Sequence, residues 1–233
     1  MGSIRYLNVW VATGWYRGRV QKILILLHNA AQDFLRHHQT TNRQLSTTNR
    51  LKKPIFVKKI SKKMTATASA TKRYTVAEYL QVEARSGERH EFYNGEIRPM
   101  PGGTIPHNRI TKNVIQHLGN ALDSKAGYEV FGSDQKLYLP HYNFYLYPDA
   151  LVVAETPIQA EHDAQAIINP VLIIEVLSPS TEAYDRRQKF LEYRSLPTFR
   201  EYVLIRQNAP EILSFFREAP DLWRESSVEG LEK

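Results

Sequence analysis

The chain of 233 residues contains no cysteine. This absence excludes disulfide bonds, thiolate metal ligands and a cysteine nucleophile, and it leaves carboxylates, histidine and water as candidate metal ligands. Long apolar runs are also absent, since stretches such as 22–27 and 171–174 fall far short of the roughly 20 residues that a membrane-spanning helix needs. We therefore expect a cytoplasmic protein with no membrane span, with enough hydrophobic residues (42%) to build a real core.

Acidic residues are nearly missing from the start of the chain. Residues 1–63 contain 13 Lys and Arg and one acid, Asp33, a net charge of +12, whereas residues 64–233 contain 18 bases and 23 acids, a net charge of −5. The basic pI thus belongs to the N-terminal segment, and the part that resembles a folded domain is mildly acidic. Net charge is therefore no argument for nucleic-acid binding by that domain.

The N-terminal segment has three interpretations. It could be a targeting peptide, a disordered basic tail that contacts nucleic acid, or translated leader sequence upstream of the native start. We favour the third, because Met64 begins a short polar lead into a strong helix start. We accordingly divide the chain into a disordered or non-native extension over 1–63 and one domain over 64–233.

Local signals predict most elements of that domain. Thr75 with Glu78 forms a capping box for a helix that runs to about Ser86. Asn94-Gly95 suits a type I′ turn and predicts a β-hairpin of 91–93 with 96–98. Further along, apolar spacing predicts a helix over 107–122, a helix over about 181–195, and strands over 128–131, 135–139, 144–153, 171–177, 200–205 and 211–216. This order indicates an α/β (mixed α+β) fold, with a mixed central sheet flanked by helices.

Two carboxylates interrupt buried strands. Glu175 lies within the nearly continuous apolar run 171–177, where a lone carboxylate is unfavourable by several kcal/mol unless it is protonated, paired or metal-bound. Asp149 follows Pro148 at the opening of another apolar stretch. Each has an ordinary alternative, Glu175 at a wetted strand end and Asp149 in turn chemistry. Together, however, acids from neighbouring strands can converge on one Mg²⁺, which activates water for attack on a phosphodiester.

Other signatures of chemistry are absent from the sequence. It contains no P-loop, no dinucleotide fingerprint, no Ser-His-Asp arrangement and no zinc-ligand spacing. Tyr138, Tyr142, Tyr145 and Tyr147 could stack on unpaired bases. We expect them instead to pack as the amphipathic residues that strands favour.

A long ordered signature surrounds the two acids. Pro148-Asp149 is followed by Glu175 in the segment 173–181 (Ile-Ile-Glu-Val-Leu-Ser-Pro-Ser-Thr), then by Asp185, Lys189 and Tyr193, and then by 200–205. In this pattern the chain resembles the Uma2 family of the PD-(D/E)xK superfamily over about 72–223. The resemblance implies a restriction-endonuclease-like core in which Asp149 and Glu175 bind the metal, supported by Glu91, Glu96, His107, Asp185 and Tyr193. Proteins of the family it resembles usually continue with a further short strand and a closing segment, whereas this chain ends shortly after Trp223.

One position departs from the superfamily pattern. The pattern has a lysine two residues after the glutamate, and this chain has Leu177 there. The resemblance makes Lys189 the replacement, supplied from the following helix, where it would orient water or stabilise charge on phosphate. The sequence alone favours a solvated Asp185–Lys189 pair one helical turn apart, on a face pointing away from the apolar residues. Likewise, His107 is either a site residue or a capping and packing residue at a helix start.

The expected function is therefore a Mg²⁺-dependent endonuclease, with Mn²⁺ as an alternative ion and DNA as the substrate. The catalytic residues would be Asp149, Glu175 and Lys189. The alternative is a catalytically inactive protein of the same fold that binds nucleic acid or protein. A homodimer is compatible with either function.

Overall fold

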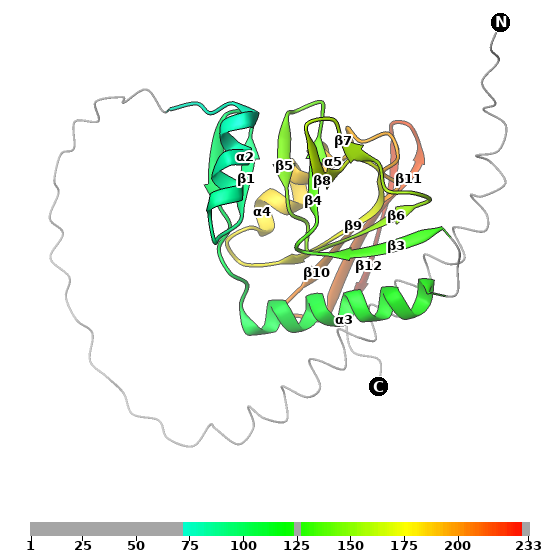
Figure 1. Cartoon of the computed structure of the whole chain (residues 1–233). Helices are drawn as coiled ribbons and strands as arrows, with labels where there is room; N and C mark the ends of the chain where they lie inside the picture. The colour runs from blue at the N-terminus through cyan, green and yellow to red at the C-terminus, as the bar shows by residue number, and fades with distance from the viewer. Residues whose placement is uncertain (1–71, 124–126, 230–233) are drawn as a thin grey trace, which may run out of the picture.

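Two mixed β-sheets carry the described part of the chain, residues 72–123 and 127–229 of the computed structural model (Figure 1). The first sheet has the spatial order β2 (Glu96–Pro99), β1 (His90–Tyr93), β5 (Phe144–Leu146), β4 (Lys136–Leu139), β8 (Asp163–Ile167) and β7 (Gln159–Ala160). The second has the order β12 (Leu222–Glu229), β11 (Glu211–Ala219), β10 (Glu201–Arg206), β9 (Pro170–Leu177), β6 (Ala150–Ala154) and β3 (Tyr128–Gly132). The α+β class is thus confirmed, with the strands divided between two sheets. The predictions for residues 1–63 lie outside the described residues.

The helices follow the predicted starts closely. In α2 (Val76–Arg85) the capping box is present: the Glu78 N–H donates to Thr75 Oγ1 at 3.2 Å, and the Thr75 N–H donates to Glu78 Oε2 at 2.8 Å. Helix α3 (Ile105–Leu122) begins slightly before the predicted residue, with Thr104 as its N-cap. The third helical segment consists of α4 (Glu182–Tyr184), the π-helical turn η1 (Asp185–Lys189) and α5 (Phe190–Tyr193). No helix of residues 72–123 or 127–229 is long and apolar enough to span a membrane.

The predicted hairpin is also confirmed. β1 pairs with β2 in antiparallel register, and Asn94 and Gly95 both have positive φ angles, 44° and 108°. Positive φ at both positions is what a type I′ turn requires, and glycine adopts it without strain.

The strand predicted over 144–153 is wrong as a single element. The chain forms β5 in the first sheet, breaks at Tyr147-Pro148-Asp149, and continues as β6 in the second sheet. Proline has no N–H to donate to a ladder, so it lies at the break. This change of sheet leaves Asp149 immediately before β6, beside the interior strand β9. Strands β7, β8 and β12 were not predicted from the sequence, and β11 extends beyond the predicted edge strand.

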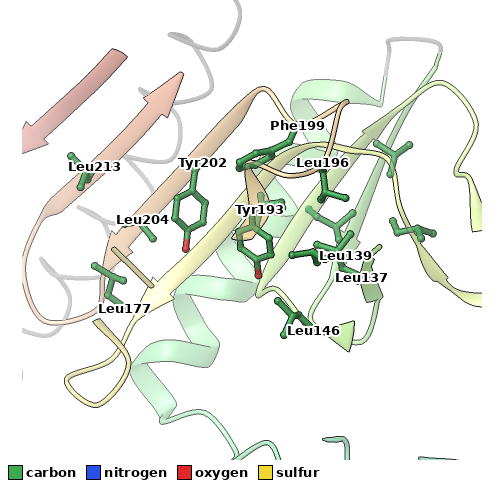
Figure 2. Close-up of a cluster of buried hydrophobic side chains, with 14 residues drawn as sticks. Leu137, Leu139, Leu146, Leu177, Tyr193, Leu196, Phe199, Tyr202, Leu204 and Leu213 are labelled. Atoms are coloured by element: carbon green, nitrogen blue, oxygen red, sulfur yellow. The ribbon is translucent and has the colours of Figure 1, made fainter. Parts of the chain in front are cut away.

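The second sheet is covered on both faces. Helix α3 packs its apolar stripe, including Ile110, Val114 and Leu118, against one face (Figure 1). On the other face, the leucines of the first sheet meet the side chains of α5 and β10, as Figure 2 shows for Leu137, Leu139 and Tyr193. Successive side chains of a strand alternate between faces. Glu175 therefore shares the face of Ile173 and Leu177, toward the first sheet and α5.

One buried carboxylate lies apart from this face. Glu201 at the start of β10 is 1% exposed, and neither of its side-chain oxygens has a hydrogen-bond partner within the described residues. Burial raises the pKa of Glu201 from 4.5 to about 8, against a smaller opposing effect of Arg224. The folded chain therefore holds this carboxyl protonated across the neutral range.

We expect the free energy of unfolding to fall as pH rises from about 5 to 9, and Glu201→Gln to flatten that decline. The folded carboxyl keeps its proton up to about pH 8, whereas the unfolded one releases it near 4.5. The folded state thus binds more protons in this window, and stability is lost as pH rises through it. Urea unfolding at several pH values measures this. Between about pH 5 and 9 the parent should lose roughly 2–4 kcal/mol more of its free energy of unfolding than Glu201→Gln does. The control Glu225→Gln, at an exposed position of β12, should behave as the parent, and an unchanged slope in Glu201→Gln would contradict the expectation.

Candidate active site

Asp149 and Glu175 lie side by side on neighbouring antiparallel strands. Ala150 of β6 is paired with Ile174 of β9. Antiparallel register continued by one residue places Asp149 opposite Glu175, with both side chains on the same face. The backbone N–H of Val176 donates to Asp149 Oδ2 at 2.7 Å and so ties the aspartate to β9. The two predicted ligand residues are therefore brought together.

Glu175 is buried but compensated. Lys189 Nζ lies 2.8 Å from Glu175 Oε1, and the Tyr193 hydroxyl donates to the same oxygen at 2.8 Å. Burial raises the pKa of Glu175, and Lys189 opposes that rise, while Asp149 and Asp185 add to it. For Lys189, burial alone would lower the pKa, but Glu175, followed by Tyr193, Glu91 and Asp185, raises it well above its ordinary value. The neighbouring acids therefore favour the charged form of the lysine.

The interpretation of Asp185 and Lys189 as a solvated pair is wrong. Both residues are buried, at 4% and 7% exposure, and Lys189 Nζ lies 3.7 Å from Asp185 Oδ1. They begin and end the π-helical turn η1, in which i→i+5 bonding accommodates an extra residue per turn. The helical segment buries Asp185, Lys189 and Glu192, whereas its apolar Leu191 is 49% exposed. Regular α-helical spacing therefore misassigned the buried face.

His107 reaches the aspartate from the first turn of α3. Its backbone N–H donates to the capping Thr104 Oγ1 at 3.3 Å, and its Nε2 lies 3.1 Å from Asp149 Oδ2. The hydrogen bond to Asp149 raises the pKa of His107, although burial acts in the opposite direction. The histidine therefore combines the helix-start position with a contact in the site, and Asp149 is held from both β9 and α3.

Gly103 makes room for this histidine. A Cβ at Gly103 would lie 2.9 Å from His107 Nδ1 and would overlap Asn108 Oδ1, whereas a Cβ at Gly102 would meet nothing within 4 Å. The close approach of the loop to α3 thus depends on a missing side chain at one of two adjacent glycines.

The two remaining predicted residues, Glu91 and Glu96, differ in position. Glu91 on β1 accepts a hydrogen bond from Tyr93 at 2.7 Å, and its charge acts on Lys189 and Asp185. Glu96 on β2 does not join the cluster, because it is exposed and forms a two-point contact with Arg98 at 2.9 and 2.7 Å.

Sequence reasoning missed several contributors. Tyr93 shares the Glu91 face, and the two-residue period of a strand could have indicated it. Tyr202 donates from its hydroxyl to the backbone oxygen of Asp185 at 3.1 Å, and Tyr184 donates to Glu192 at 2.8 Å. Nothing local in the sequence indicates the Tyr202 contact, because it joins β10 to the helical segment. The Tyr184 contact lies within that segment, between residues eight positions apart.

The donor set suits a hard divalent cation. Within the described residues, no group of three or more His, Asp or Glu side chains is arranged to hold a metal ion. The residues that could hold one are the adjacent pair Asp149 and Glu175. Mg²⁺ typically binds proteins through one or two carboxylates and completes its shell with water and substrate phosphate oxygens. Two neighbouring carboxylates, with two further acids nearby, fit that requirement.

The comparisons agree with this geometry at the level of fold. A crystal structure described as "a putative nuclease belonging to DUF820" from Anabaena variabilis matches with a TM-score of 0.55 and 16% identity, covering 67% of this chain and 85% of that one. The chain therefore has a nuclease-like fold. Its acidic pair lies at β9 and just before β6, and its buried lysine lies in the π-helical turn η1.

Sequence relatives assign it more narrowly. The chain belongs to the Uma2 family, whose model, described as "Putative restriction endonuclease", matches residues 76–233. Two uncharacterised proteins of Synechocystis are 42% and 36% identical to it, over 60% and 63% of this chain and 78% and 75% of theirs.

We predict that Gly103→Ala weakens the contact between His107 and Asp149, because the new methyl group displaces the imidazole. The amide of Val176, bonded to the same aspartate oxygen, reports on this contact. Its NMR resonance should shift, and its hydrogen exchange should accelerate about fivefold, which corresponds to about 1 kcal/mol of hydrogen bonding. Gly102→Ala serves as the matched control and should leave this amide unchanged. Equal behaviour of the two variants would show that Gly103 does not position the histidine.

Proposed function

We propose that the chain is a Mg²⁺-dependent endonuclease that hydrolyses phosphodiester bonds in DNA. The observation that carries the proposal is the placement of Asp149 opposite Glu175, with the charged Lys189 ammonium 2.8 Å from the glutamate. The match to a family described as "Putative restriction endonuclease" supports the same reaction class. We propose the cytoplasm as the compartment of this activity, since the chain forms no disulfide bonds.

Each residue of the cluster has a distinct task in this proposal. Asp149 and Glu175 would hold Mg²⁺, or Mn²⁺ in its place, and the ion would supply a water molecule of lowered pKa as the nucleophile. Lys189 stabilises the negative charge that develops on the phosphate oxygens. His107 and Tyr193 orient the two ligand carboxylates through the contacts of 3.1 and 2.8 Å.

The surrounding acids set the charge of the site. Glu91 and Asp185 both act on Lys189 and help to raise its pKa. The lysine therefore stays protonated, as a group that stabilises anionic oxygen must be. The excess of carboxylates over cations also favours capture of a divalent ion, because buried like charges repel one another until a cation is bound.

A binding module without turnover is the second candidate, and one contact favours it. Lys189 and Tyr193 both occupy Glu175 Oε1. If Lys189 and Tyr193 keep these contacts with Glu175 in the presence of a divalent ion, the cluster only stabilises the fold. The protein would then bind nucleic acid or protein partners without cleaving them.

The cleavage prediction uses supercoiled plasmid DNA in the presence of Mg²⁺. Asp149→Asn, Glu175→Gln and Lys189→Met should each lower the rate by at least about 100-fold, because each removes a ligand or the stabilising charge. The exposed control Glu225→Gln should retain the parental rate. Full activity in Asp149→Asn or Glu175→Gln would rule out this site, and inactivity of the parent on varied DNA and RNA would favour the binding module.

A second prediction concerns stability and needs no substrate. Addition of Mg²⁺ or Mn²⁺ should raise the melting temperature of the parent, because a ligand stabilises only the state that binds it. The rise should disappear in Asp149→Asn and persist in Glu225→Gln. Thermal unfolding with and without the ion measures both effects, and an equal rise in Asp149→Asn would place the ion elsewhere.

A further inference from the structure

Four aromatic rings from three elements and one turn form a continuous row on the molecule. Tyr142, in the turn between β4 and β5, stacks on Phe144 with ring centroids 5.4 Å apart. Phe144 meets Tyr93 of β1 edge-on at 5.0 Å, and Tyr93 meets Tyr184 of α4 at 6.5 Å. We call Tyr142, Phe144, Tyr93 and Tyr184 the aromatic ladder.

One end of the aromatic ladder reaches the active-site cluster. The Tyr93 hydroxyl donates to Glu91 Oε2 at 2.7 Å, and the Tyr184 hydroxyl donates to Glu192 at 2.8 Å. Burial raises the pKa of Tyr93 and Tyr184, and the ammonium of Lys189 opposes the rise in both. Both rings are therefore within electrostatic reach of the lysine, whereas Tyr142 at the other end belongs to a surface turn next to the exposed His141.

The aromatic ladder is accessible, unlike the aromatic core beside it. Tyr79, Tyr145 and Phe92 are 0–1% exposed, but all four rings of the ladder are only partly buried. Tyr145 and Tyr147 are buried, as expected of strand residues in a core. Tyr93, Tyr142 and Phe144 also pack against the core cluster between the two sheets, but each keeps part of its surface open to solvent.

A guanidinium plane extends the ladder. Arg98 lies over the ring of Tyr93 at 4.1 Å from its centroid, and Glu96 holds it there through the two-point contact. Arginine planes, like aromatic rings, are surfaces on which unpaired bases stack. Glu96, which does not join the acidic cluster, thus keeps Arg98 in position over the ring of Tyr93.

Phosphate contacts alone do not explain substrate binding by the described domain. Residues 64–233 have a net charge of −5, and the arginines that follow the active-site strands are paired. Arg186 and Arg206 each contact both Glu182 and Glu211, at 2.6–3.1 Å. Because the net charge is negative and these two arginines are paired, a source of affinity other than charge is needed near the site.

We propose that the aromatic ladder is a stacking subsite for unpaired nucleobases, so that the substrate is single-stranded or locally unpaired DNA. This proposal rests on the proposed nuclease function. In a duplex the faces of the bases are hidden by stacking, whereas an unpaired strand can lay successive bases on Tyr142 and Phe144 and deliver its backbone toward Lys189. Stacking tolerates any sequence, because every base has an aromatic face.

The test measures binding of a short fluorescent single-stranded oligodeoxynucleotide to the full chain, with Ca²⁺ in place of Mg²⁺ to suppress cleavage. Tyr142→Leu should bind about 5- to 100-fold more weakly than the parent, as expected from the loss of one stacked base. Phe144→Leu provides a second variant that keeps an apolar side chain. Tyr128→Leu, at a partly buried position packed in the cluster on the α3 side of the second sheet, is the matched control and should bind as the parent does. All variants carry the same basic residues 1–63, so the contribution of that segment cancels in the ratios.

An abasic oligonucleotide separates stacking from support of the fold. The parent should bind it more weakly than the intact strand, and Tyr142→Leu should lose this preference. Equal losses on the intact and abasic strands, or a parent that prefers duplex of the same sequence, would overturn the stacking subsite while leaving the cleavage result intact. A parent that shows the stacking preference but no cleavage would support the subsite and overturn the nuclease.

Discussion

The ion pair between Lys189 and Glu175 is the interaction on which the site depends. A carboxylate on a buried strand face is tolerated only when a partner compensates its charge. Here the partner is an ammonium 2.8 Å away, joined by a tyrosine hydroxyl on the same oxygen. Because each charge requires the other, the pair holds β9 and the helical segment after it in one arrangement. This arrangement also fixes the position of Asp185, which lies in the same helical segment.

Two breaks in regular structure bring the other groups to this pair. The proline break after β5 sends the chain from one sheet to the other and leaves Asp149 opposite Glu175. The π-helical turn directs Asp185 and Lys189 inward together. Irregular backbone of this kind is common at functional sites, because it aims side chains that regular spacing would scatter. Helix α3 adds His107, so the residues of the site come from both sheets and from two helical segments.

The family match and the geometry support different parts of the functional argument. The match assigns the chain to Uma2, and the structural likeness at 16% identity shows the fold alone. The chemistry comes from the residues themselves: two adjacent acids suited to a hard cation and a lysine whose charge is kept by its neighbours. Leu177 stands where the superfamily pattern has a lysine, and it is buried in the core, while Lys189 brings an ammonium to the same glutamate from the following helix. In the proposed function, Lys189 takes the part of the lysine that the pattern has two residues after the glutamate.

The sequence by itself determined the local elements and the acidic pair. The capping box of α2, the Asn94-Gly95 turn and the apolar stripe of α3 act over a few residues, so they are visible in the sequence and present in the structure. Asp149 and Glu175 were detectable because carboxylates are conspicuous beside apolar strands. Only the tertiary structure decided that 144–153 divides between two sheets, that Asp185 and Lys189 of the last helical segment are buried, and that the rings of Tyr93 and Tyr184 meet. The reason is physical: strand pairing and the burial of charge are settled by partners distant in the chain, and local patterns carry no information about which partner will be there.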